Sequence, residues 1–174
     1  MDRTPSALVR SLRAAGTFLQ RAPRAAALVA ALAWMGAIRA LSSLPGDSLG
    51  LAPALGYVFN LGHAVLYGVL AACWILCLPR ERGWPRLGAR ESLGVFAATL
   101  CFALLDERLQ GAVPGRTVSA WDLWTDAVGA AAMLWVVRHV GSERAGDAGL
   151  VARVAVGLAA CAAAAALATW PPVA

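Results

Sequence analysis

The stretch LGYVFNLGHAVLYGVLAACWILCL, residues 55–78, decides the fold class of this chain. It contains no Asp, Glu, Lys or Arg. A helix needs about 20 predominantly apolar residues to cross a hydrocarbon core about 30 Å thick. The run is long and does not alternate between polar and apolar residues, so it predicts a helix and not a strand. A helix is also favoured because it satisfies its own backbone hydrogen bonds inside a bilayer.

Four further segments are apolar and of similar length, and the composition agrees with them. The chain is 60% hydrophobic and 14% charged over 174 residues, whereas a soluble domain carries about 25% charged residues. This excludes a disordered chain and an ordinary cytosolic enzyme. The sequence therefore predicts an all-α, polytopic membrane helix bundle with about five transmembrane helices. The other four segments are 24–44, 92–105 with a continuation to 110, 120–137 and 150–170.

The basic residues indicate how the bundle is oriented. All fifteen are arginine, and the net charge is +5. If the five spans alternate, twelve arginines fall on one side and only Arg39, Arg108 and Arg116 on the other. Cytoplasmic loops are rich in Arg and Lys, so this bias predicts a bacterial cytoplasmic (inner) membrane protein with a cytoplasmic N-terminus. The charge thus fits contact with membrane lipid, and no nucleic acid is expected as a partner. The twelve are Arg3, Arg10, Arg13, Arg21, Arg24, Arg80, Arg82, Arg86, Arg90, Arg138, Arg144 and Arg153.

The spans divide the chain into three parts. We expect a basic cytoplasmic segment over 1–24, a four-helix membrane domain over 25–140, and a loop with an additional transmembrane helix over 141–174. A cleaved signal peptide is the alternative for the first span. Against it, the apolar run continues through Arg39 to Ser42 and Ser43 without a small-x-small cleavage site.

Polar residues inside the second span suggest a site. Asn60, His63 and Tyr67 are spaced three and four residues apart and therefore share one helix face. At 1.5 Å per residue, His63 lies roughly 10 Å below the outer surface. A lone histidine on an apolar helix is also common as a hydrogen-bonded packing residue.

The third span ends with polar residues at a similar depth. Asp106, Glu107 and Gln110 occupy its last turns, and the sequence 113–116, Val-Pro-Gly-Arg, predicts a tight turn after it. Charge inside a span is costly and marks a candidate functional site. The alternative is that Asp106 and Glu107 lie above the hydrocarbon and are solvated.

The fourth span begins with a capping pattern. Ser119 is expected to cap the helix, with Asp122 three residues later in the capping-box position. Asp122, Asp126 and Gly129 then share one face. Three helices thus bring polar groups to the same leaflet, although Asp122 is equally well explained as a capping residue.

The predicted site contains more carboxylates than neighbouring cationic groups. Four carboxylates face Arg108, Arg116 and His63, and buried carboxylates must be paired, protonated or bound to a cation. Arg116 is either an ordinary loop charge or a residue that locks the turn through a bidentate carboxylate pair. The residues show no metal-ligand spacing of a known type, so no metal, cofactor or catalytic residue is assigned.

These residues resemble the signature of the VanZ-like family over roughly residues 41–137. The pattern is D-E-x-x-Q, then V-P-G-R-x-x-S, then D-x-x-x-(D or N)-x-x-G, with H-x-x-x-(Y or F) in the second helix. Two departures stand out, because Phe59 and Asn60 replace basic residues common before the histidine, and Asp126 stands where many members have Asn. The resemblance places the following residues in one pocket: His63, Tyr67, Asp106, Glu107, Gln110, Arg116, Ser119, Asp122 and Asp126.

The resemblance implies a small multi-helix membrane protein with an outward-facing polar pocket. The family is named after a protein linked to resistance to teicoplanin, a glycopeptide antibiotic, so a role in the cell envelope is implied, with a cell-wall precursor or a glycopeptide-related ligand. The reaction is unknown. The alternatives are a metal- or carboxylate-dependent membrane enzyme acting on a lipid-linked envelope precursor, a small proton-coupled transporter, and a structural clamp that pins the helices.

Overall fold

The computed structural model describes residues 6–44, 53–79, 84–85, 87–116 and 118–170. Every described regular element is helical, as expected for an all-α fold. Four of the predicted inside arginines, Arg3, Arg80, Arg82 and Arg86, lie outside the described residues. The helices are α1 (Ala7–Leu19), α2 (Arg24–Ser42), α3 (Pro53–Cys77), α4 (Ala89–Gln110), α5 (Ala120–Gly141) and α6 (Asp147–Thr169).

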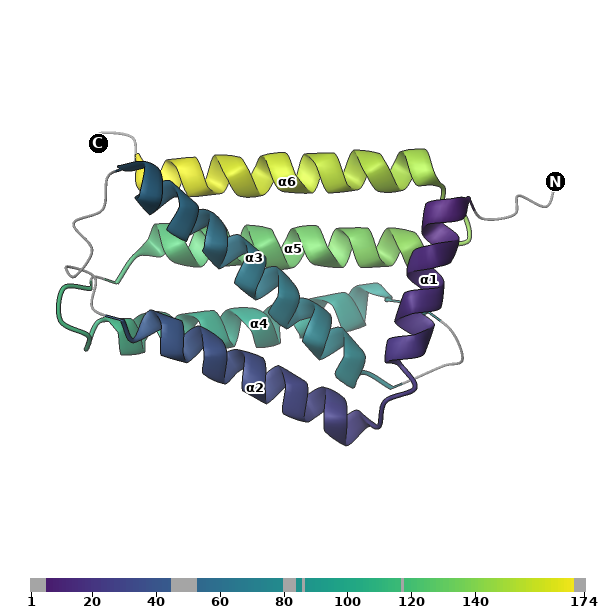
Figure 1. The fold of residues 1–174 in the computed structure, drawn as a ribbon, viewed down its shortest axis with the longest axis horizontal. Helices are drawn as coiled ribbons and strands as arrows, with labels where there is room; N and C mark the ends of the chain where they lie inside the picture. The colour runs from purple at the N-terminus through teal and green to yellow at the C-terminus, as the bar shows by residue number, and fades with distance from the viewer. Residues whose placement is uncertain (1–5, 45–52, 80–83, 86, 117, 171–174) are drawn as a thin grey trace.

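The five predicted spans correspond to α2–α6, which lie side by side as a bundle with α3 crossing α5 (Figure 1). Helix α1 was not foreseen as a helix, because its basic residues placed it in a cytoplasmic segment. Among the described residues, three helices are long and apolar enough to cross a membrane: α2, α3 and α6. Helices α4 and α5 are of similar length but carry more charged residues and are not among these three, so the count of about five spans is not confirmed.

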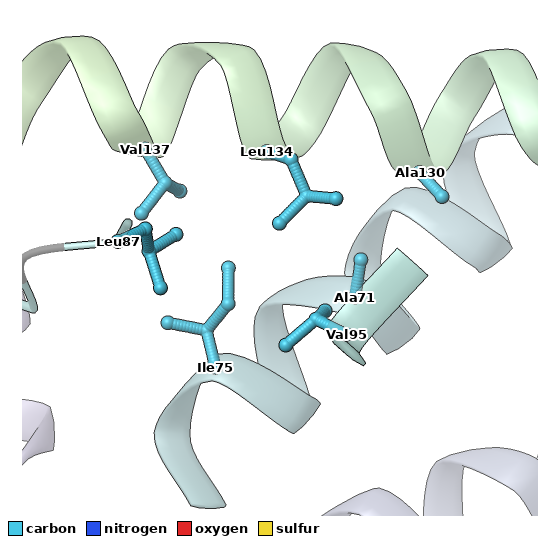
Figure 2. Close-up of a cluster of buried hydrophobic side chains, with 7 residues drawn as sticks. All are labelled: Ala71, Ile75, Leu87, Val95, Ala130, Leu134 and Val137. Atoms are coloured by element: carbon cyan, nitrogen blue, oxygen red, sulfur yellow. The ribbon is translucent and has the colours of Figure 1, made fainter. Parts of the chain in front are cut away.

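The core lies between α3, α4 and α5. Ile75 of α3, Val95 of α4 and Leu134 of α5 belong to one buried cluster, with Leu87 just before α4. Figure 2 shows these side chains pointing toward one another from the three helices. A second cluster joins α2 to α3 and α4. It contains Ile38, Tyr67, Leu70 and Ala103.

Helices α3 and α5 approach closely where both carry small residues. A Cβ atom on Gly129 would lie 2.0 Å from the carbonyl oxygen of Ala64, and one on Gly68 would lie 3.2 Å from the carbonyl oxygen of Gly129. Small residues allow two helix backbones to meet in this way, and such contacts are typical of membrane helix pairs. This contact fixes how α3 crosses α5, and it sets the position of the polar residues one turn away.

Helix α1 lies across the end of the bundle where α5 ends and α6 begins (Figure 1). The side chain of Asp147 accepts hydrogen bonds from the backbone N–H groups of Leu8 and Val9, at 3.2 and 3.0 Å. The guanidinium of Arg13 donates to the carbonyl oxygens of Val140 and Ser142, at 2.8 and 2.7 Å. These bonds satisfy backbone groups that helix ends leave unpaired, and they anchor α1.

Candidate functional site

Asp106 is the centre of a buried hydrogen-bond network near the C-terminal end of α4. Its carboxylate is fully buried. Ser42 and Gln110 donate to Oδ2 at 2.7 and 3.0 Å, and the Tyr67 hydroxyl lies 3.5 Å from the same atom. An ionised carboxylate only accepts hydrogen bonds, so this ring of donors is well matched to it. Asp106 therefore ties α2, α3 and α4 together.

The cation that pairs with Asp106 comes from α2. Nη1 of Arg39 lies 3.2 Å from Oδ1 of Asp106, and the Arg39 side chain is 30% exposed. The expectation that Arg108 and Arg116 balance the carboxylates is therefore not met at Asp106. Arg108 is exposed instead, because it lies on the outer face of α4. Nor is Asp106 solvated above the hydrocarbon, because the protein itself buries it.

Arg116 fastens the turn that joins α4 to α5. Its Nε atom donates to the carbonyl oxygen of Leu44 at 3.2 Å, and its Nη1 atom to Oε1 of Gln110 at 3.4 Å. The predicted tight turn is present, with a hydrogen bond from Arg116 N–H to Val113 oxygen at 3.1 Å. Gly115 has a φ of 72°, a conformation that favours glycine. Arg116 thus locks the turn through a carbonyl and an amide, so neither of the two alternatives, an ordinary loop charge or a carboxylate pair, describes it.

Ser119 caps α5 as predicted, but the capping box is completed by another helix. The Ser119 hydroxyl accepts from the backbone N–H of Asp122 at 3.3 Å. The backbone N–H of Ser119 donates to the carboxylate of Glu107 in α4. In the usual box the residue at position 122 would accept this second bond. The prediction for Asp122 is therefore only half correct. Its backbone N–H binds the capping hydroxyl as expected, but its carboxylate does not accept the second bond and is left for other partners.

His63 and Asp126 form the second polar centre of the site. Nδ1 of His63 lies 3.0 Å from Oδ1 of Asp126, and the two side chains are 16% and 3% exposed. In a neutral imidazole that faces an ionised Asp126, the carboxylate oxygen accepts, so Nδ1 carries the proton. Nε2 then has a free lone pair, and within the described residues it has no hydrogen-bond partner. The His63 ring is stacked with that of Tyr67, their centroids 6.4 Å apart.

The predicted convergence of α3, α4 and α5 is thus present. His63, Tyr67 and Asp106 are linked through the ring stack and the hydroxyl contact, and Glu107 reaches the start of α5. Asn60 does not join them, because its amide donates to the hydroxyl of Thr169 in α6 at 3.0 Å.

A family model named VanZ/LLP1 matches residues 12–141 of the chain. That range contains every residue of the site and covers well over half of the sequence. The chain belongs to the VanZ/LLP1 family. No curated protein and no solved structure matches it.

The matched region of this VanZ/LLP1 protein runs from within α1 to the last residue of α5. It therefore includes the helices that build the site and leaves out α6. The family is one of membrane proteins, and apolar exposed residues on α2 and α6 agree with a lipid environment. Examples are Val29, Leu32, Val156 and Leu158.

The acidic residues of the VanZ/LLP1 site are each engaged differently. Asp106 is surrounded by donors, Asp126 is held by His63, and Glu107 accepts from Ser119. Among the described residues, no group of three or more His, Cys, Asp or Glu side chains is placed to hold a metal ion. The site therefore has two polar centres. At Asp106 the carboxylate is surrounded by donors from the protein, whereas at the pair of His63 and Asp126 the Nε2 atom of His63 remains available to a ligand.

Sequence reasoning missed Arg39 and Ser42. Both contact Asp106, yet no residue of α2 was predicted to belong to the site. The signal was available, because Arg39 is a charged residue inside an apolar span, and such residues pair with one another or mark function.

Proposed function

We propose that this VanZ/LLP1 protein acts in the bacterial cell envelope from the cytoplasmic membrane. In this proposal, the N-terminus is cytoplasmic and the His63 site faces outward. Its ligand is a cell-wall precursor or a glycopeptide-related molecule, and its effect is protection against teicoplanin-type antibiotics. The support is the family membership together with the arginine distribution.

The pair formed by His63 and Asp126 carries the proposal. A carboxylate on Nδ1 fixes the tautomer and orientation of the imidazole, and it leaves Nε2 to accept a hydrogen bond or a proton from a ligand. Asp126 is almost fully buried whereas the imidazole remains in part accessible. This arrangement suits an imidazole that accepts a hydrogen bond or a proton from a ligand outside the bundle.

Asp122 and Glu107 complete the proposed binding surface. Asp122 lies about one helical turn before Asp126 on α5, and the nearly buried Glu107 reaches the start of α5 through the Ser119 N–H. Asp122 is half-buried, and in the described residues its side chain has no hydrogen-bond partner. An acidic rim beside an imidazole favours a ligand that carries a cationic or hydrogen-donating group, as amino sugars and peptides do.

The test is glycopeptide susceptibility in a host that lacks the gene. The strains would carry the wild-type protein, Glu107→Gln, His63→Gln or an empty vector, with membrane abundance quantified in each. Glu107→Gln removes a charge but keeps a side-chain oxygen for the Ser119 N–H. Glu143→Gln is the matched control, because it makes the same change on an exposed residue beyond the far end of α5.

We expect the wild type and Glu143→Gln to protect equally, and both site variants to lose protection at unchanged abundance. If the wild type gives no protection, the glycopeptide role is wrong. Equal protection by all variants would mean that the cluster is a structural clamp. The enzyme alternative predicts turnover: it requires the wild type, and not His63→Gln, to convert an isolated lipid-linked precursor.

A further inference from the structure

A groove lies on the bundle surface at the end opposite the His63 site. It has a volume of about 690 Å³ and is formed by α4, α5 and α6. Three basic side chains line it: Arg138, His139 and Arg153. Among the described residues that line it, none is acidic. We propose that this groove binds one anionic phospholipid of the adjacent leaflet, with its phosphate between Arg138 and Arg153.

The basic residues are placed to receive a phosphate. Arg138 is exposed, and in the described residues it makes no hydrogen bond or ion pair. Arg153 is held in place, because its guanidinium lies 5.3 Å from the centroid of the Trp135 ring and Nη1 donates to the Gly149 oxygen at 2.9 Å. A planar guanidinium with remaining free N–H groups binds phosphate oxygens in pairs.

Among the described residues, no carboxylate forms an ion pair with these basic groups. Glu91 lines a different groove, on the side of α4 that faces α3. Asp147 is occupied by the backbone N–H groups of Leu8 and Val9. The groove therefore keeps a net positive lining, and basic pockets between membrane helices favour anionic head groups.

The groove is polar at its end and apolar farther along the helices, as a lipid is. Arg138 lies three residues before the end of α5, about 5 Å along the axis. The Arg153 guanidinium reaches back toward the start of α6, where it donates to the Gly149 oxygen. Phe96, Ala131 and Leu134 line the groove farther in. Phe96 lies about 10 Å from the start of α4. Acyl chains would lie along these apolar residues while the phosphate stays at the basic end, and a soluble anion would leave them uncovered.

The experiment is native mass spectrometry of the full-length protein in detergent. The probes are phosphatidylglycerol, phosphatidylcholine with the same acyl chains, and inorganic phosphate. The double variant Arg138→Gln with Arg153→Gln would be compared with Arg24→Gln with Arg144→Gln. The second pair removes two exposed arginines at the same end that do not line the groove. Thermal unfolding of each variant, and of Arg138→Gln alone, checks that the fold is kept.

We expect wild type to retain one phosphatidylglycerol in preference to phosphatidylcholine. The groove variant should lose about tenfold or more in phosphatidylglycerol affinity, and the control pair less than about twofold. Arg138→Gln alone, which breaks no contact within the described structure, should reproduce part of the loss. Equal retention of both lipids, an equal effect of the control pair, or displacement of the lipid by inorganic phosphate would overturn the proposal. The groove lies at the opposite end from His63, so its test is independent of the glycopeptide test.

Discussion

Arg39 and Asp106 form an ion pair at 3.2 Å across α2 and α4, although 67 positions separate them in the sequence. The pair is asymmetric, because the Asp106 side chain is fully buried and that of Arg39 is 30% exposed. Removing Arg39 would leave a fully buried carboxylate without its cation, whereas removing Asp106 would leave its neutral donors without an acceptor and a guanidinium that is partly exposed. The two residues therefore contribute unequally to stability.

Replacing Arg39 should be at least as destabilising as replacing Asp106. We expect Asp106→Ala to lower the free energy of unfolding by about 1–3 kcal/mol, because it leaves several donors unpaired. Arg39→Ala should lower it by about 3 kcal/mol, because it leaves the buried carboxylate of Asp106 without its cation. Reversible unfolding in detergent, with both single variants and the double variant, measures this. The idea fails if Arg39→Ala costs less than about 1 kcal/mol or if the double variant shows no coupling.

The bond from Ser119 N–H to Glu107 predicts a difference between two substitutions. Glu107→Gln keeps an acceptor oxygen and should unfold within about 0.5 kcal/mol of wild type. Glu107→Leu removes the acceptor and leaves the start of α5 without its partner, which should cost about 1–2 kcal/mol. Thermal unfolding compares them. Identical midpoints for the two variants would show that this bond does not support α5.

The close approach of α3 and α5 makes Gly129 hard to replace. In Gly129→Ala, the new methyl group would lie 2.0 Å from the Ala64 oxygen, so the helices must separate. Overpacking of this kind costs about 1–3 kcal/mol. Gly62→Ala is the matched control, because nothing lies within 4 Å of its Cβ position. A Gly129→Ala protein as stable as Gly62→Ala would contradict this close contact between α3 and α5.

Helix α1 should detach more easily when Arg13 is lost. Arg13→Ala removes the donors that bind the Val140 and Ser142 oxygens. Amide hydrogen exchange over residues 7–19 should then become about tenfold faster, without a change in α3 or α5. Arg10→Ala is the control, since Arg10 is exposed. Equal exchange in both variants would mean that Arg13 does not hold the helix.

The orientation can be tested with single cysteines in a background where the native cysteines are replaced. Ala112→Cys lies in the turn between α4 and α5, and Glu143→Cys between α5 and α6. The arginine distribution predicts that an impermeant maleimide labels position 112 in intact cells and position 143 only after permeabilisation. The reverse pattern would place the His63 site in the cytoplasm and exclude the proposed outward role.

The sequence by itself determined the five long helices and the polar residues of the second, third and fourth of them. Apolar run length and helical spacing are local properties, so His63 with Tyr67, and Asp106 with Gln110, could be assigned to shared faces. The turn at 113–116 and the Ser119 cap were also predicted correctly, because both depend on a few consecutive residues.

Only the tertiary structure decided which groups pair. Arg39 reaches Asp106, Glu107 takes the place of Asp122 in the capping box, and Arg116 binds a carbonyl and an amide. Each of these contacts depends on how one helix is rotated and crosses its neighbour, which the close contact of Gly129 with Ala64 helps to set. Spacing along one helix carries no information about that rotation, so the sequence located the polar residues without assigning their partners.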